Sequence, residues 1–117
     1  YELFTEYEVD CIIRIGTCGA YSTDLKLFDL LNVDTAVSES TFAKYAWGIE
    51  DVIIPHQGKA FDMINYTAAA MNRAVHKTVV HSSDIFYRKE KGTPQTAVDN
   101  NCVAVEMEAF ALFANAK

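Results

Sequence analysis

Residues 9–16 are Val-Asp-Cys-Ile-Ile-Arg-Ile-Gly, and residues 17–20 continue as Thr-Cys-Gly-Ala. β-branched and apolar side chains dominate the first part, a composition that favours a strand buried on both faces. The glycine that follows indicates a sharp bend. We therefore predict a buried strand over 9–16 and a tight turn between Gly16 and Gly19.

The rest of the chain alternates between extended and helical patterns. Residues 27–37 and 76–81 are apolar and β-branched enough for strands, and residues 60–75 have apolar positions at helical spacing. Residues 38–58 are irregular apart from a short apolar triplet at 52–54. The first seven residues resemble the last turns of a helix.

The C-terminal third begins with a break at Gly92-Thr93-Pro94. Thr93 is expected to cap a short helix that has Pro94 at its first position. A short strand over 102–105 and a helix over 106–117 follow. Alternating strands and helices predict an α/β fold with one domain spanning 1–117, and both ends of the chain lack the signals that usually begin or end an element.

Composition excludes several classes of function. Half of the 117 residues are apolar, the net charge of −6 is spread along the chain, and the three cysteines lack the CxxC spacing of a zinc site. We expect a cytoplasmic protein with reduced thiols, without a metal and without nucleic-acid or membrane partners. The histidines His56, His76 and His81 have no ligand spacing and are interpreted as structural or surface residues.

Arg14 and the glycines after it are the first candidate site. Ligands of open α/β sheets bind beyond the carboxyl ends of strands, and Gly16, Thr17 and Gly19 could expose backbone N–H groups beside the Arg14 guanidinium. These groups suit a phosphate. The local pattern alone favours an ordinary turn in which Arg14 pairs with a carboxylate, because two glycines at this spacing are too common to specify a ligand.

A second candidate site is Val-Glu-Met-Glu-Ala at 105–109, where a strand meets a helix. One of the carboxylates of Glu106 and Glu108 could accept paired hydrogen bonds from a diol, although acidic residues at a helix start also serve as caps. The third is Ser-Ser-Asp-Ile-Phe-Tyr at 82–87, in which Phe86 could stack on a heterocyclic base.

Taken in order, these three motifs resemble the nucleoside phosphorylase superfamily, which includes hexameric purine nucleoside phosphorylases, uridine phosphorylases and thioether-nucleoside hydrolases. Leu25-Lys26-Leu27 with Asp29 adds to the resemblance, and only residues 38–60 fail to match. The resemblance implies a three-layer fold with a central mixed β-sheet flanked by helices, incomplete at both ends in this chain.

The resemblance also assigns roles. Arg14, Gly16, Thr17 and Gly19 would bind phosphate, and Phe86 would pack against the base. Val105 and Glu106 would line base and sugar, Met107 would lie under the ribose, and Glu108 would bind the ribose hydroxyls. Inorganic phosphate would be the co-substrate and no cofactor would be needed. The acid that protonates the leaving base is expected beyond Lys117, so we predict that the isolated chain is inactive.

The branch of the family follows from spacing. Uridine phosphorylases place a glutamine and an arginine where this chain has Glu90 and Gly92, and nineteen residues (87–105) separate Phe86 from Glu106, as in the purine branch. Arg14 with Thr17 favours phosphorolysis over hydrolysis. We expect a purine nucleoside phosphorylase that forms a hexamer built from dimers. A uridine phosphorylase, a methylthioadenosine-type nucleosidase and a non-catalytic nucleoside-binding remnant remain alternatives.

Overall fold

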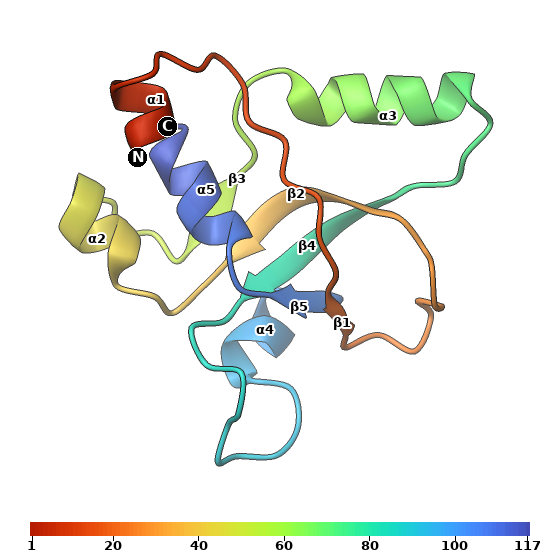
Figure 1. Cartoon of the computed structure of the whole chain (residues 1–117). Coiled ribbons are helices and arrows are strands. Elements are labelled where there is room, and N and C mark those ends of the chain that lie inside the picture. The colour runs from red at the N-terminus through yellow and green to blue at the C-terminus, as the bar shows by residue number, and fades with distance from the viewer.

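The computed structural model describes residues 1–117, which form a mixed five-stranded sheet with helices around it (Figure 1). The strands are β1 (Gly19–Ala20), β2 (Leu31–Val37), β3 (Ile53–Pro55), β4 (His76–Ser82) and β5 (Ala104–Glu106). The helices are α1 (Glu2–Thr5), α2 (Phe42–Trp47), α3 (Ala60–Ala70), α4 (Gln95–Asp99) and α5 (Ala109–Asn115). None of them combines the length and the apolar composition needed to cross a bilayer.

The centre of the sheet is parallel and its two edges are antiparallel. The strand order is β1-β5-β4-β2-β3, in which β4 runs parallel to both β2 and β5. β3 pairs antiparallel with β2, and β1 pairs antiparallel with β5. Because β2, β4 and β5 point the same way, their carboxyl ends meet at one end of the sheet, which is where ligands of open α/β sheets bind.

Two apolar clusters show that both faces of the sheet are covered. Ala36 belongs to a cluster that includes Val80, Ala104 and Phe110 of α5, whereas its neighbour Val37 packs with Ala97 of α4 and Cys102. Successive strand residues point to opposite faces, so the two clusters lie on opposite sides of β2. The predicted arrangement of a sheet between two helical layers is confirmed.

The prediction of a buried strand over 9–16 is wrong. Residues 9–18 form no regular element, and Ile13 and Ile15 are exposed. Residues 10–18 make no backbone–backbone hydrogen bond, because no strand of this chain lies beside them. Pairing begins only at Gly19 and Ala20, opposite Val105 and Ala104.

The tight turn predicted between Gly16 and Gly19 is also absent. The glycines with positive φ are Gly48, Gly58 and Gly92, so neither Gly16 nor Gly19 has the left-handed conformation that requires glycine. Both lie close to a side chain instead. A Cβ atom on Gly16 would lie 3.0 Å from Nη2 of Arg14, and one on Gly19 would lie 3.1 Å from Cγ1 of Val105.

Other boundaries shift by a few residues. The strand predicted over 27–37 begins at Leu31, after a turn in which the Lys26 amide donates to Asp29. The helix predicted over 60–75 ends at Ala70, and the one predicted over 106–117 spans Ala109–Asn115. The strands predicted at 76–81 and 102–105 are β4 and β5. The Thr93 cap is wrong, because Pro94 occupies the N-cap of α4 without a side-chain bond.

The irregular stretch 38–58 contains a helix that the sequence analysis missed. It is α2, which buries Ala43 and ends at Gly48 with a φ of 69°. Trp47 joins the two ends of the chain, since its ring packs 5.7 Å from that of Tyr1 and its Nε1 donates to Asn115 of α5 at 3.3 Å. Figure 1 shows both termini beside each other at this place.

Candidate functional site

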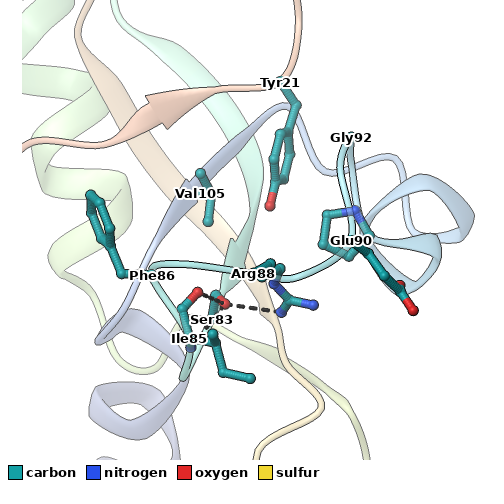
Figure 2. A pocket seen from close by; sticks show the side chains of 9 residues that line it. Tyr21, Ser83, Ile85, Phe86, Arg88, Glu90, Gly92 and Val105 are labelled. Carbon is teal, nitrogen blue, oxygen red and sulfur yellow. Dashed lines mark hydrogen bonds between the residues drawn. The ribbon is translucent and has the colours of Figure 1, made fainter.

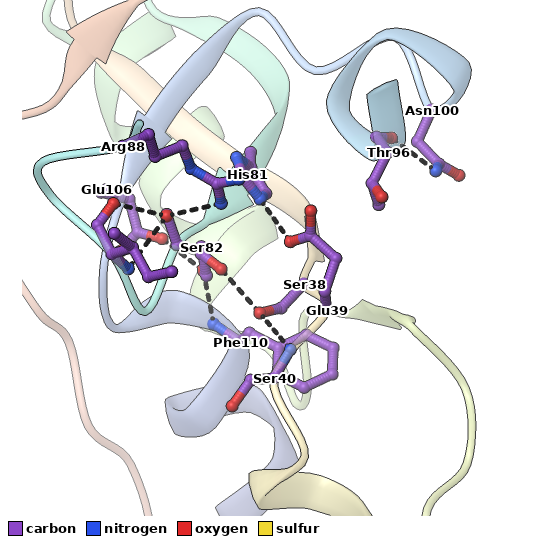
Figure 3. A network of polar contacts seen from close by, with 12 residues as sticks. Ser38, Glu39, Ser40, His81, Ser82, Arg88, Thr96, Asn100, Glu106 and Phe110 are labelled. Carbon is purple, nitrogen blue, oxygen red and sulfur yellow. Dashed lines mark hydrogen bonds and ion pairs between the residues drawn. The ribbon is translucent and has the colours of Figure 1, made fainter. Parts of the chain in front are cut away.

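The site is built at the carboxyl ends of the three parallel strands. β2 is followed by Ser38 and Glu39, β4 ends at Ser82 and is followed by Ser83, and β5 ends at Glu106. Ser38, Ser82, Ser83 and Glu106 are all buried. A polar side chain buried at this position needs hydrogen-bond partners. Figure 3 shows Ser38, Ser82 and Glu106 with theirs, and Ser83 bonds to Ile85 and Arg88.

Glu106 is the most connected of these side chains. Its side chain is 4% exposed, and it accepts hydrogen bonds from the backbone amides of Glu108 (3.0 Å) and Ala109 (2.8 Å) and from the hydroxyl of Ser82. Ser82 in turn accepts from the amide of Phe110 at 2.9 Å. The side chains of Glu106 and Ser82 together accept hydrogen bonds from the first N–H groups of α5. The capping role considered from sequence is therefore confirmed for Glu106.

Arg14 brings the first and second motifs together. Its Nη1 lies 3.5 Å from Oε2 of Glu106, and its Nη2 donates to Oε2 of Glu108. The Arg14 side chain is 35% exposed, because the segment around it is not the buried strand that the sequence predicted. Its pairing with carboxylates is the alternative considered from sequence, but the two carboxylates are those of the predicted sugar site.

Glu108 occupies the N-cap position of α5 without a capping bond from its side chain. That side chain is 54% exposed, in contrast to the buried Glu106 two residues earlier. Met107 between them is 40% exposed. The two carboxylates therefore differ in function within the fold. Glu106 is fixed by the protein, and Glu108 is accessible to a solute.

The remaining residues of the predicted phosphate site lie on the exposed segment that leads to β1. Thr17 is exposed, and Gly19 pairs with Val105 in the β1–β5 ladder. Gly16 lies under the guanidinium of Arg14, as its short distance to that group shows. The chain thus places Arg14, Gly16 and Gly19 beside the 105–108 motif.

A pocket of about 280 Å³ adjoins this cluster (Figure 2). Phe86 and Val105, two of the three residues predicted to contact a base, line it, whereas Glu106 does not. Glu90 and Gly92, the positions that distinguish the uridine branch, line it too. In Figure 2 the rings of Tyr21 and Phe86 lie on opposite sides of Val105, and Phe86 is 76% exposed. The third motif therefore meets the second at one pocket.

Sequence analysis missed two further residues of this pocket. Arg88 lines it and donates from Nη2 to the hydroxyl of Ser83 at 2.9 Å. Tyr21 lines it from the opposite side, and its hydroxyl lies 2.9 Å from Nδ1 of His81. The only sequence signal for either is its position directly after a motif, since Tyr21 follows Ala20 and Arg88 follows Tyr87.

His81 links the pocket to the end of β2. Its side chain is 0% exposed, and its Nε2 lies 2.7 Å from Oε2 of Glu39. Burial alone would raise the pKa of Glu39, but the hydrogen bonds from His81 and from its own backbone, with the charges of His81 and Arg88, lower it overall. Desolvation raises the pKa of Tyr21 despite the nearby Arg88. His81 is thus buried for its polar contacts as well as its packing.

Comparison with known proteins agrees with these motifs. The model of the phosphorylase superfamily matches residues 1–117. DeoD-type purine nucleoside phosphorylases of Mycoplasma genitalium and Mycoplasma pneumoniae are 42% and 40% identical to this chain, over 99% of it and 50% of their own length. The chain therefore spans about half the length of these curated relatives.

Solved structures show the same fold at low sequence identity. Helicobacter pylori MTAN superimposes with a TM-score of 0.78 at 21% identity, covering 98% of this chain and 54% of that protein. Purine nucleoside phosphorylase from Toxoplasma gondii, in complex with immucillin-H, gives 0.71 at 18% identity, with 86% and 41% covered. Because the family model matches every residue from 1 to 117, this chain belongs to the phosphorylase superfamily.

Proposed function

We propose that this chain provides the phosphate, ribose and base contacts of a purine nucleoside phosphorylase. The reaction is the phosphate-dependent cleavage of the N-glycosidic bond of a purine ribonucleoside or deoxyribonucleoside. Its products are the free base and the sugar 1-phosphate. Inorganic phosphate is the co-substrate, and the reaction needs no cofactor.

The contact of Arg14 with Glu106 and Glu108 supports this proposal above all. Phosphorolysis requires an anion on one face of the sugar and carboxylates near the positive charge that develops on the anomeric carbon. One guanidinium with two carboxylates beside it, 92 and 94 positions later in the chain, supplies both kinds of group at one place. Thr17 and the backbone near Gly16 add donors for the phosphate oxygens.

Glu108 is the residue best suited to hold the ribose hydroxyls. Its side chain is accessible, whereas the oxygens of Glu106 already accept hydrogen bonds from the protein. When Glu108 turns to the ribose diol, the Arg14 fork gains free donors for phosphate. Met107 lies under the sugar, and the base extends into the pocket between Phe86 and Val105.

We extend the proposal to the oligomeric state of the protein and to its location in the cell. Ile15, Leu27 and Phe28 are at least 90% exposed, which is unusual for large apolar side chains of a soluble monomer. We assign this surface to contact with a second copy in a homo-oligomer built from dimers, a hexamer in the full assembly. The reduced cysteines fit a cytoplasmic protein.

A nucleoside panel tests the assignment on the full-length protein. Inosine, uridine and methylthioadenosine are each incubated with and without inorganic phosphate, and the free base is measured. The proposal expects base release from inosine that depends on phosphate and yields ribose 1-phosphate. Phosphate-independent release from methylthioadenosine would assign a nucleosidase instead, and preference for uridine would assign the uridine branch. No release from any of the three would favour a binding module.

A further inference from the structure

Tyr21, His81 and Glu39 form a linear chain of hydrogen bonds that ends in the pocket. The Tyr21 hydroxyl lies 2.9 Å from Nδ1 of His81, and Nε2 of the same ring lies 2.7 Å from Glu39. The His81 side chain is 0% exposed, so these two groups are its polar partners. The three residues come from the segment after β1, the end of β4 and the segment after β2.

The direction of each hydrogen bond follows from chemistry. An ionised carboxylate only accepts hydrogen bonds, so whenever the His81 imidazole is neutral its proton is on Nε2, facing Glu39. Nδ1 is then an acceptor, and the Tyr21 hydroxyl must donate to it. With its only proton committed to His81, the Tyr21 oxygen has only lone pairs left to offer to the pocket.

Arg88 and Cys102 are the other titratable groups near Tyr21, His81 and Glu39. Arg88 lies close enough to stabilise the carboxylate form of Glu39, and its own Nη2 is engaged with Ser83. Cys102 packs near Tyr21, and burial, with Glu39 adding to it, raises its pKa to about 11, so at neutral pH it is an uncharged thiol. No hydrogen bond joins either residue to Tyr21.

We propose that Tyr21 is a specificity-determining residue, whose oxygen accepts a hydrogen bond from an N–H group on the edge of the bound base. His81 and Glu39 are positioning residues that fix the Tyr21 hydroxyl as an acceptor toward the pocket. The proposal rests on the function proposed above. On this proposal Tyr21 selects one class of ligand, purines whose six-membered ring carries an N–H donor.

The test compares two nucleosides that differ in this donor. Adenosine has an exocyclic amino group, and purine riboside has no N–H on its six-membered ring. The readout is the ratio of kcat/KM for adenosine to that for purine riboside, measured with phosphate on the full-length protein. We expect Tyr21→Phe to lower this ratio by about 3- to 10-fold, the loss of one hydrogen bond to a neutral acceptor.

Glu39→Gln is the second variant. Unlike the carboxylate, a glutamine can also donate to Nε2 through its amide, which allows the His81 proton to move to Nδ1 and the Tyr21 hydroxyl to turn into the pocket as a donor. We expect the same ratio to fall in this variant too. Tyr66→Phe on α3 and Glu50→Gln are matched controls, because both residues are exposed and outside the pocket.

The outcomes separate this inference from the function on which it rests. A lowered ratio in both variants, with unchanged controls, supports the role of Tyr21. Equal losses on both nucleosides would mean that Tyr21 and Glu39 only support the fold, and the inference would be overturned while the phosphorylase function stood. If the wild-type protein cleaves neither nucleoside, both proposals are wrong.

Discussion

The Nη1 atom of Arg14 lies 3.5 Å from the Oε2 atom of Glu106, although 92 positions separate the two residues. Arg14 lies on an exposed segment that is not part of any strand, and Glu106 is at the buried end of β5. The contact joins the two. A cation from one part of the chain and a fixed carboxylate from another thereby meet next to Val105, which lines the pocket.

Arg14→Ala should impair the use of phosphate more than the binding of nucleoside. The substitution removes a guanidinium that can make charge-assisted hydrogen bonds to phosphate. We expect the KM for phosphate to rise by about 10- to 100-fold and the KM for inosine by much less. Steady-state kinetics of the full-length protein measure both, with Arg14→Lys as a variant that keeps the charge. Equal losses for the two substrates would argue against a phosphate site at Arg14.

Glu106 and Glu108 should respond differently to truncation. Glu106→Ala leaves buried amides of α5 without an acceptor, at a cost of about 1–3 kcal/mol for each unsatisfied group, so urea unfolding should shift to lower concentration. Glu108→Ala removes an exposed side chain and should leave the unfolding midpoint nearly unchanged, while turnover falls roughly 10²-fold through lost ribose positioning. The opposite pattern would exchange the two roles.

Gly16→Ala and Gly19→Ala should affect different substrates. The new methyl group at position 16 would meet the flexible end of Arg14, and that at position 19 would meet Val105. We expect Gly16→Ala to raise the KM for phosphate several-fold and Gly19→Ala to raise that for the nucleoside. Each variant is the control for the other, since both add one methyl group. A common effect on both substrates would indicate a general loss of structure.

The stability of the protein should depend on Glu39 in acid. The pKa of Glu39 is lowered in the folded state, so its contribution is present above the unfolded value, near 4.5, and is lost as the pH falls through the folded pKa. We expect urea midpoints of the wild type to decrease more steeply below about pH 4.5 than those of Glu39→Gln. Parallel curves for the two proteins would show that the Glu39–His81 contact does not stabilise the fold.

Cys102 should be the least reactive thiol. It is 8% exposed, and burial with the nearby Glu39 raises its pKa to about 11, so almost none of it is thiolate at pH 8. Cys11 and Cys18 are exposed. Mass spectrometry after brief treatment with iodoacetamide should find Cys102 unmodified in the folded protein and modified after unfolding in urea. Early alkylation of Cys102 would show that α4 does not cover it.

Local sequence patterns were sufficient where an element packs in the way that its own residues dictate. β4 has β-branched residues and α3 has apolar positions at helical spacing, and both lie within a few residues of their predicted ranges. The stretch 9–16 has an equally clear strand composition, but a strand also needs a neighbour to accept its hydrogen bonds. Composition carries no information about that neighbour. α2 escaped detection because its six residues are too few for a helical period to emerge from the irregular stretch around it.

The residues of the candidate site also fall into those that sequence patterns predicted and those that they did not. The three motifs could be found in sequence because each is a contiguous run, and the structure brings Arg14, Phe86, Val105, Glu106 and Glu108 to one region. The hydrogen bonds of His81 join residues 60 and 42 positions away, and no local pattern marks them. His81 itself was assigned to structure because histidine spacing carries information about metal ligands, not about buried polar chains.

The short ladder between β1 and β5 gives the two halves of the site unequal local stability. Glu106 is anchored in the parallel core, whereas the segment that carries Arg14 makes its backbone hydrogen bonds to the sheet only from Gly19 to Ser22, opposite residues 103–105. Separation of this short ladder and of the Arg14 ion pairs would carry the guanidinium away while β5, β4, β2 and β3 stayed assembled. Amide hydrogen exchange would therefore be rapid on the cationic side of the cluster and slow on its acidic side, within a few ångströms of each other.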